Sequence, residues 1–172
     1  MKYLIVVLVL IFIYIIIRII IKIKQDKDIY KLLKNNEKEY QLIKAKKKAY
    51  DYVLRFADID VYLCVLKIPK YSQICINSKD TWKLSYNTFK QDKGKAYSNS
   101  RYLDEIKYFL KNDIESKKNY LKLVFVYKRY DEIVRYLNET ELDVIDFNKS
   151  PYGYKITSYD NFIKDLEILS KK

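Results

Sequence analysis

Apolar residues run almost unbroken through the first 23 positions of the chain. Between Tyr3 and Ile17 the only polar groups are two tyrosine hydroxyls, and the apolar run continues to Ile23 with Arg18 and Lys22 as interruptions. A helix of about 21 residues is roughly 31 Å long, which matches the hydrocarbon thickness of a bilayer. The pattern therefore predicts a transmembrane helix over residues 1–23.

A cleavable signal peptide is the alternative to an anchor. Its apolar region would span about 7–15 residues and end at a small-residue cleavage site. Here the longer run meets Arg18, Lys22 and Lys24, and no Ala-x-Ala-like site follows. We interpret the segment as an uncleaved signal anchor. Arg18 is then a residue whose long side chain extends toward the charged end of the helix, rather than a functional intramembrane arginine.

Basic residues are concentrated on one side of the predicted span. The N-terminal side has Lys2 and the amino group, whereas seven basic residues lie between Arg18 and Lys38. The positive-inside rule then predicts a single-pass membrane protein whose C-terminal domain is cytoplasmic. Cys64 and Cys75 agree with this location, because they lie in apolar runs and form no disulfide framework of the secreted type.

Helical spacing of apolar residues continues beyond the predicted span. Residues 24–56 contain no Gly or Pro, and apolar side chains recur at roughly helical intervals from Ile29 to Leu54, with charged residues between them. This pattern is typical of an amphipathic helix. We therefore predict a juxtamembrane helix over residues 24–56 that packs one apolar face on the following domain.

Residues 57–172 mix strand and helix patterns and are numerous enough for one α/β domain with a hydrophobic core. The predicted strands are 61–66, 73–77, 82–86, 121–127 and 142–147, and the predicted helices lie within 102–110, 130–137 and 159–169. We expect the first two strands to pair as a hairpin across Pro69. This order predicts a three-layer α/β sandwich with a mixed sheet.

Missing residue types narrow the chemistry available to the chain. It has no histidine, which excludes Ser-His-Asp and Cys-His catalysis and every histidine-ligated metal site. Gly94 and Gly153 are its only glycines, too few for a phosphate-binding P-loop or a dinucleotide-binding turn. Any catalysis must therefore use carboxylates and lysines, either alone or with a hard, oxygen-bound cation such as Mg²⁺.

The net charge of +12 has two interpretations. It suits a nucleic acid or anionic lipid as partner, but a chain this rich in Lys, Ile, Asn and Tyr also looks like the product of an AT-rich genome. The densest basic stretch supplies the candidate nucleic-acid-binding residues Lys44, Lys46, Lys47 and Lys48. The alternative for this stretch is a solvated surface.

Two short motifs carry the candidate chemistry. Ile59-Asp60 directly precedes the first predicted strand of the domain, and Ile74-Cys-Ile-Asn77-Ser-Lys79 covers the end of the second. Together with Trp82, the Asn99-Ser100 loop and strand 121–127, they resemble the NERD (nuclease-related) domain. That family is a branch of the PD-(D/E)XK, restriction-endonuclease-like fold, and its members often sit beside transmembrane segments.

The resemblance implies a role for each candidate residue. Asp60, with Glu39 or less favourably Glu37 on the first helix, would hold Mg²⁺, and Lys79 would stabilise charge on phosphoryl oxygens. Asn77 stands where the family has a carboxylate, and an amide contributes no negative charge to metal binding. The resemblance therefore implies a weakened or inactive nuclease-like domain, with Mg²⁺ as cofactor only if it is active. An alternative alignment places residues 65–67 on the second motif of the family, and it leaves no acidic residue at the position of the family's carboxylate.

Plain structural roles compete with each assignment. Asp60 can mark a strand start, Lys79 a solvated hairpin end and Asn77 a turn. Two functions therefore stay open: a membrane-anchored nuclease-like domain that faces the cytoplasm and binds nucleic acid or another anionic partner, and a non-catalytic protein-interaction scaffold at the inner membrane face. The scaffold predicts an exposed apolar or tyrosine-rich patch and no cluster of acids at the hairpin.

Overall fold

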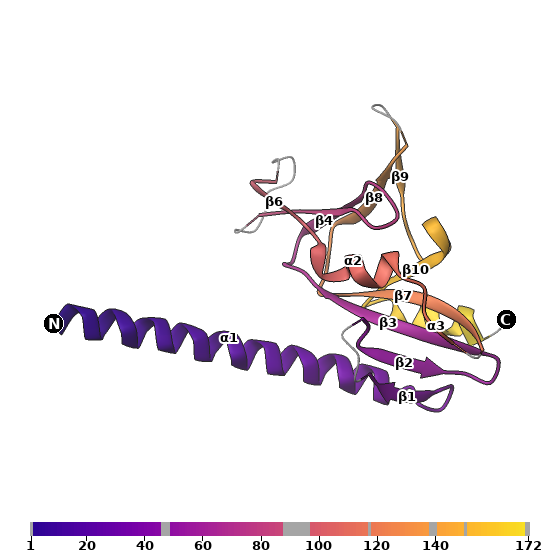
Figure 1. Ribbon diagram of the computed structural model, residues 1–172, viewed down its shortest axis with the longest axis horizontal. Helices are drawn as coiled ribbons and strands as arrows, with labels where there is room; N and C mark the ends of the chain where they lie inside the picture. The colour runs from indigo at the N-terminus through magenta and orange to yellow at the C-terminus, as the bar shows by residue number, and fades with distance from the viewer. Residues whose placement is uncertain are drawn as a thin grey trace. The chain divides into compact units, whose positions relative to one another are not determined.

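The computed structural model describes residues 2–45, 49–87, 97–116, 118–137, 141–149 and 151–170. The chain divides into two compact units, residues 1–37 and residues 38–172. The first unit is dominated by one helix, α1 (Lys2–Lys34), and the second contains all the strands (Figure 1).

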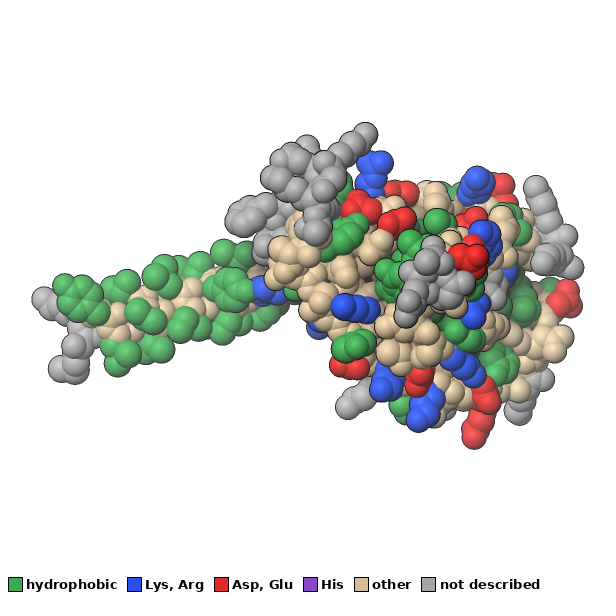
Figure 2. Space-filling model, turned by 90° about the horizontal axis from the view of Figure 1, so that it is seen from above, with side chains coloured by type: hydrophobic (Ala, Val, Ile, Leu, Met, Phe, Trp, Pro, Cys, Tyr) green, Lys and Arg blue, Asp and Glu red, His purple; other side chains and the backbone are tan. Residues whose placement is uncertain are grey.

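Helix α1 is long and apolar enough to cross a membrane. Its candidate span, Tyr3–Lys34, has a mean hydropathy of 3.4 in its most apolar 18-residue window. The apolar side chains from Tyr3 to Ile23 are exposed, Phe12 for example by 64%, and apolar side chains cover the helix in Figure 2. In water such a surface would be unfavourable, whereas in lipid it is matched to its surroundings. These properties support the predicted membrane helix at the N-terminus.

The predicted juxtamembrane helix over residues 24–56 is correct only as far as Lys34. Asn35 and Asn36 follow, and the Asn36 side-chain amide donates a hydrogen bond to the Leu32 carbonyl oxygen at 2.8 Å. Asparagine competes in this way for the unpaired carbonyls at a helix end. Beyond the turn the chain forms two antiparallel strands, β1 (Gln41–Lys44) and β2 (Tyr52–Arg55), so the helix prediction is wrong for that part.

Two five-stranded sheets make up the second unit. Sheet A has the order β1-β2-β3-β7-β10, and its last three strands are mutually parallel. Besides β1 and β2 it contains β3 (Ile59–Lys67), β7 (Asn119–Tyr127) and β10 (Tyr154–Ser158). Sheet B has the order β6-β5-β4-β8-β9, in which only β4 and β8 are parallel. Its strands are β4 (Ser72–Ile76), β5 (Trp82–Tyr86), β6 (Asn99–Tyr102), β8 (Glu132–Tyr136) and β9 (Leu142–Val144).

The α/β class is therefore confirmed, but the single mixed sheet is wrong because there are two. The predicted hairpin across Pro69 is also wrong, since β3 belongs to sheet A and β4 to sheet B. The link between them turns at Tyr71, which has a left-handed φ of 57°, and the Ser72 hydroxyl donates to the Pro69 carbonyl oxygen at 2.7 Å. This turn sends the chain into a new sheet instead of back along β3.

Other elements differ from the sequence predictions in smaller ways. The predicted helix within 130–137 is strand β8, strand β10 was not predicted, and the strand at 142–147 ends at Val144. The other two predicted helices are confirmed as α2 (Asp104–Lys111) and α3 (Phe162–Ser170). In the turn before α3, the Ser158 hydroxyl oxygen accepts a hydrogen bond from the Asn161 N–H at 3.1 Å.

The main core lies between the sheets and includes α2, as Figure 1 shows. It contains Leu66 and Val124 from sheet A, Leu84 from sheet B and Phe109 from α2, all nearly or fully buried. Alternate residues of β7 face the opposite side of sheet A. There the Phe125 ring packs edge-on against Phe162 of α3, with 5.4 Å between ring centroids. Sheet A is thus covered on both faces, which explains the nearly continuous apolar sequence of β7.

Candidate functional site

Asp60 is a buried carboxylate near the start of β3. It is 5% exposed and lies directly opposite Arg55 of β2 in the antiparallel register. The Arg55 Nε donates to Asp60 Oδ1 at 3.4 Å, and about half of the Arg55 side chain is exposed. A buried carboxylate needs such a partner to offset the loss of hydration. The pair is long for a charged hydrogen bond, so it holds Asp60 only weakly.

A pocket of about 360 Å³ opens beside this pair. Besides Arg55 and Asp60 it is lined by Tyr62, Glu115, Ser116 and Lys118. The Lys118 Nζ donates to the Ala57 carbonyl oxygen at 3.0 Å, which ties the segment before β7 to the turn between β2 and β3. The pocket thus brings a second carboxylate and two basic groups close to Asp60. Sequence reasoning missed Glu115 and Lys118, because nothing in the sequence pairs positions 60 and 115.

Asn77 and Lys79 lie elsewhere, in the turn between β4 and β5 of sheet B. The N–H groups of Asn77 and Ser78 both donate to the Thr81 carbonyl oxygen, at 3.0 and 3.3 Å. The Asn77 side-chain oxygen accepts a hydrogen bond from the Cys75 thiol at 3.0 Å. These contacts give Asn77 a role in building a turn. Within the described residues, none from this turn lines the pocket at Asp60.

The remaining predicted residues are not gathered at one site. Glu39 is exposed in a bend between α1 and β1, not on a helix as the resemblance implied. Lys44 is exposed at the end of β1, and Lys46, Lys47 and Lys48 lie outside the described residues. Among the residues that the structure describes, no group of three or more Cys, Asp or Glu side chains is arranged to hold a metal ion. Mg²⁺ binding therefore stays a prediction.

Lys122 is a buried basic residue that sequence reasoning also missed. It sits in β7, 7% exposed, and its Nζ donates to the carbonyl oxygens of Leu110 at 3.3 Å and Asn112 at 2.7 Å. Burial lowers the pKa of Lys122, while the nearby Asp113 carboxylate opposes that shift. The lysine satisfies carbonyls at the C-terminus of α2. A lone lysine in an otherwise apolar strand was the available sequence signal.

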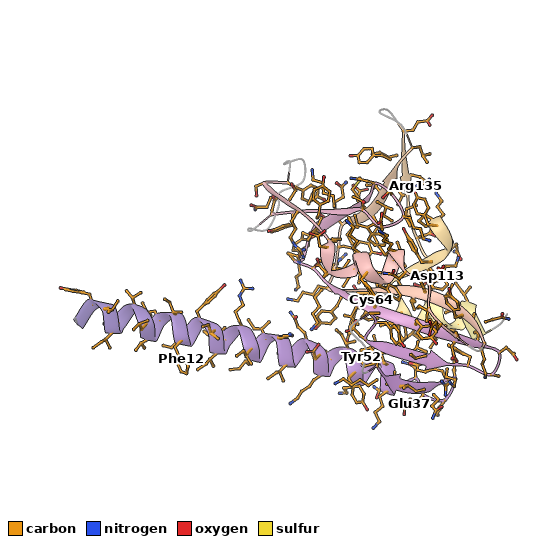
Figure 3. All side chains as sticks on the ribbon, in the orientation of Figure 1. Phe12, Glu37, Tyr52, Cys64, Asp113 and Arg135 are labelled. Atoms are coloured by element: carbon orange, nitrogen blue, oxygen red, sulfur yellow. The ribbon has the colours of Figure 1, made fainter. Side chains whose placement is uncertain are left out.

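The outer edge of sheet B is unusually apolar. Four neighbouring side chains on β8, β9 and the turn after β8 are each more than half exposed, and we call them the apolar edge: Tyr136, Leu137, Leu142 and Val144. Tyr136 is directly opposite Leu142 in the β8–β9 register. Figure 3 labels Arg135, the neighbour of Tyr136, in this part of the domain. The guanidinium carbon of Arg135 lies 4.8 Å from the centre of the Tyr152 ring.

Main-chain groups on β9 point away from β8. The Ile145 N–H donates to the Ile133 carbonyl oxygen at 2.8 Å, and the Leu137 N–H donates to that of Glu141 at 3.1 Å. Hydrogen-bonded and non-hydrogen-bonded pairs alternate in an antiparallel ladder, so Leu142 and Val144 direct their N–H and C=O groups outward. In the described part of the chain β9 is the last strand of its sheet. The edge therefore presents both main-chain hydrogen-bonding groups and apolar side chains.

Comparison with known proteins gives no relative from which a function could be transferred. No family model, curated protein or solved structure matches the chain.

Proposed function

We propose that this chain is a membrane-anchored, non-catalytic protein-interaction domain that faces the cytoplasm and binds an extended segment of a partner protein along β9. The observation that carries the proposal is the apolar edge. The apolar helix α1 supports the anchor, and the excess of basic residues that follow it supports the cytoplasmic orientation.

Edge strands in soluble domains are usually protected by charged side chains, proline or a bulge. The other terminal strands of the two sheets each contain a basic residue: Lys44 in β1, Lys155 in β10 and Arg101 in β6. Strand β9 has one charged residue, Asp143, which pairs with Lys149 at 2.6 Å. Its other two side chains point to the opposite face of the sheet, where Leu142 is 53% and Val144 is 55% exposed. An added strand would pair with their outward main-chain groups and cover both side chains. Completely burying one such side chain contributes about 1.5–3 kcal/mol, so these half-exposed residues can supply a useful part of a binding free energy.

The placement of the predicted catalytic residues favours binding over cleavage. Asp60 begins a strand of sheet A, whereas Asn77 and Lys79 lie in a turn of sheet B. The nuclease-like arrangement needs its acids and lysine on adjacent strands around one metal ion. Arg55 is also paired with Asp60 and would compete with a cation for the same oxygen.

The pocket at Asp60 gives a reason to keep a second candidate, the weakened or inactive nuclease-like domain that binds nucleic acid. Asp60 and Glu115 could supply oxygen ligands to Mg²⁺, and Lys118 could face a phosphoryl oxygen, since all three line one pocket. This set replaces Asn77 and Lys79 in the chemical roles that the family resemblance implied. It requires the Arg55–Asp60 pair to open.

Photo-crosslinking tests the binding proposal. We would replace Leu142 with p-benzoylphenylalanine in the full-length chain, in its native membrane, and do the same at Tyr108, which is 64% exposed on α2 and outside the apolar edge. We expect a discrete crosslinked protein from position 142 only, lost when Val144→Lys is added. Equal crosslinking from both positions, or no effect of Val144→Lys, would contradict the proposal.

A nuclease assay separates the two candidates. The full chain in detergent is incubated with plasmid and single-stranded substrates in Mg²⁺ or Mn²⁺, beside the variants Asp60→Ala and Lys79→Ala. We expect no metal-dependent cleavage. Cleavage that is lost in Asp60→Ala but kept in Lys79→Ala would overturn the non-catalytic proposal and support the pocket at Asp60 as the active site.

A further inference from the structure

A row of polar side chains follows one face of α1 where its apolar stretch ends. Tyr14, Arg18 and Lys22 are spaced four residues apart, so they lie one above the other along the helix. Arg18 and Lys22 are the first basic residues after a long apolar run, and Asp26 is the first acidic residue of the chain. The two cations therefore precede every carboxylate in the sequence.

The Arg18 side chain is held in a defined orientation. Its Nε donates to the Tyr14 hydroxyl oxygen at 2.8 Å, and the guanidinium carbon lies 5.1 Å from the centre of the Tyr14 ring. This pairing uses one of the five N–H donors of the guanidinium. The two terminal nitrogens keep their fork geometry, which matches two oxygens of a carboxylate or phosphate.

A shallow groove of about 490 Å³ surrounds this pair on the helix surface. Tyr14, Arg18, Lys22 and Gln25 supply its polar groups, and Ile15 and Ile19 lie among its apolar lining. Polar and apolar residues alternate along this groove, so the cations Arg18 and Lys22 lie beside isoleucines at similar depths of the helix. A phospholipid offers a partner for both kinds of group, a phosphate for the cations and an acyl chain for the isoleucines. A charged group this close to the hydrocarbon region is costly unless it reaches the interface or an opposite charge.

We propose that the Arg18–Lys22 face of α1 binds the phosphate of an anionic phospholipid, with Arg18 as the bidentate donor, Lys22 as a second cation and Tyr14 as the residue that positions Arg18. An acyl chain lies along Ile15 and Ile19. The headgroup is anionic because two cations face a single phosphodiester charge, and the ammonium of a zwitterionic headgroup would be repelled by Lys22. Charge attraction between basic residues beside a span and anionic lipids is of the required sign.

This inference depends on α1 spanning a bilayer and is independent of what the following domain binds. The test uses the full-length chain in nanodiscs of phosphatidylcholine containing phosphatidylglycerol, with the lipids retained after detergent extraction counted by native mass spectrometry. We expect a retained phosphatidylglycerol that is reduced about tenfold in Arg18→Gln, the size of effect for losing one charge-assisted contact.

Lys24→Gln is the matched control. It removes the same charge from the same segment, but it lies two residues from Lys22 and therefore on the opposite side of the helix. We expect it to keep the bound lipid. Arg18→Lys should retain less lipid than the native chain, because an ammonium lacks the planar fork. Tyr14→Phe should retain an amount of lipid between those of Arg18→Lys and the native chain. Arg18→Gln makes the span more apolar, so loss of lipid cannot reflect failed insertion.

Three outcomes would overturn the proposal. Equal losses in Arg18→Gln and Lys24→Gln would mean a diffuse attraction without a site. Displacement of the lipid by millimolar inorganic phosphate would mean a site for a free anion rather than for a lipid headgroup. Retention of phosphatidylcholine as strongly as phosphatidylglycerol would contradict the anionic preference.

Discussion

The Nζ of Lys122 lies 2.7 Å from the main-chain carbonyl oxygen of Asn112, the residue that follows the last turn of α2. One lysine from the middle of sheet A thereby closes the end of a helix and fixes the start of the segment that carries Glu115. We expect Lys122→Met to lower the free energy of unfolding by about 1–3 kcal/mol, because carbonyl groups lose their donor in a buried place. Chemical denaturation of the full chain in detergent, followed by Trp82 fluorescence, measures the change.

Lys164→Met is the control for that substitution, because Lys164 is exposed on α3. Its effect should stay within about 0.5 kcal/mol. If Lys122→Met is equally mild, the contacts of Lys122 do not stabilise the end of α2.

Val134 and Val144 face each other across β8 and β9, yet they are 1% and 55% exposed. Val134→Ala should lower the free energy of unfolding by about 2 kcal/mol, since it removes buried methyl groups and leaves a cavity. Val144→Ala should change it by less than about 0.5 kcal/mol. Thermal unfolding of the two variants tests this contrast. A large loss from Val144→Ala would show that the apolar edge is part of the core rather than a free surface.

Asp165 makes stability depend on pH in the acid range. The Thr157 hydroxyl donates to Asp165 Oδ2 at 2.6 Å, but burial raises the pKa of Asp165 above its ordinary value of 3.8, partly opposed by that hydrogen bond. Between 3.8 and the raised pKa the folded chain holds the proton more tightly than the unfolded chain. Relative to Asp165→Asn, the native chain should therefore gain stability as the pH falls through that window. Denaturation curves of both chains from pH 7 to pH 4 measure the difference between their free energies of unfolding. If that difference does not change with pH, the prediction is wrong.

Cys64 makes stability depend on pH in the alkaline range. Burial in the core, with a smaller contribution from the Asp51 and Glu105 carboxylates, raises the pKa of Cys64 from 9.0 to about 12. Above pH 9 the unfolded chain loses the thiol proton while the folded chain keeps it, so the folded state loses stability as the pH rises through this window. The contribution of one such group is at most about 1.4 kcal/mol per pH unit. For each chain, the free energy of unfolding is compared with its own value at pH 8. As the pH rises, Cys64→Ala should lose less of this free energy than the native chain.

Mg²⁺ provides a direct test of the pocket at Asp60. A ligand that binds only the folded state raises stability by about 1.4 kcal/mol at ten times its Kd. For the non-catalytic domain we expect no shift in the melting temperature between EDTA and about 10 mM Mg²⁺, in either the native chain or Asp60→Asn. A Mg²⁺-dependent rise in the native chain that is absent in Asp60→Asn would favour the nuclease-like candidate.

Strands with a long continuous apolar run, such as β3 and β7, and helices with a clear periodicity, such as α2, were predictable from the sequence. Strand β8 was not, because Ile133 and Val134 are both buried on opposite faces, and two-sided burial removes the alternation that identifies a strand. Their spacing with Tyr130 and Leu137 happens to fit a helix. Strands β1 and β2 are four residues each, too short for periodicity to outweigh the surrounding Lys and Glu.

The candidate site was predicted less well than the fold. The importance of Asp60 could be proposed from its place at the start of a strand, but its partners come from other parts of the chain. The position of Arg55 opposite Asp60 depends on the β2–β3 register. The presence of Glu115 in the same pocket depends on the path of the segment before β7. The partition of β3 and β4 into separate sheets is equally non-local. A single sequence contains no signal for contacts of this kind.

The same topology has a consequence during synthesis of the chain. Strand β3 pairs in parallel with β7, from Ile59 opposite Asn119, and β4 pairs in parallel with β8, where Gln73 donates a 2.6 Å hydrogen bond to Glu132 from 59 residues away. Neither sheet can obtain its central pair until the ribosome has made more than two thirds of the protein, with α1 already emerged. Strands β3 and β4 can pair earlier only with β2 and β5, so one side of each strand stays open until β7 and β8 are made. Pairing over such long sequence separations slows folding and exposes the nascent chain to aggregation.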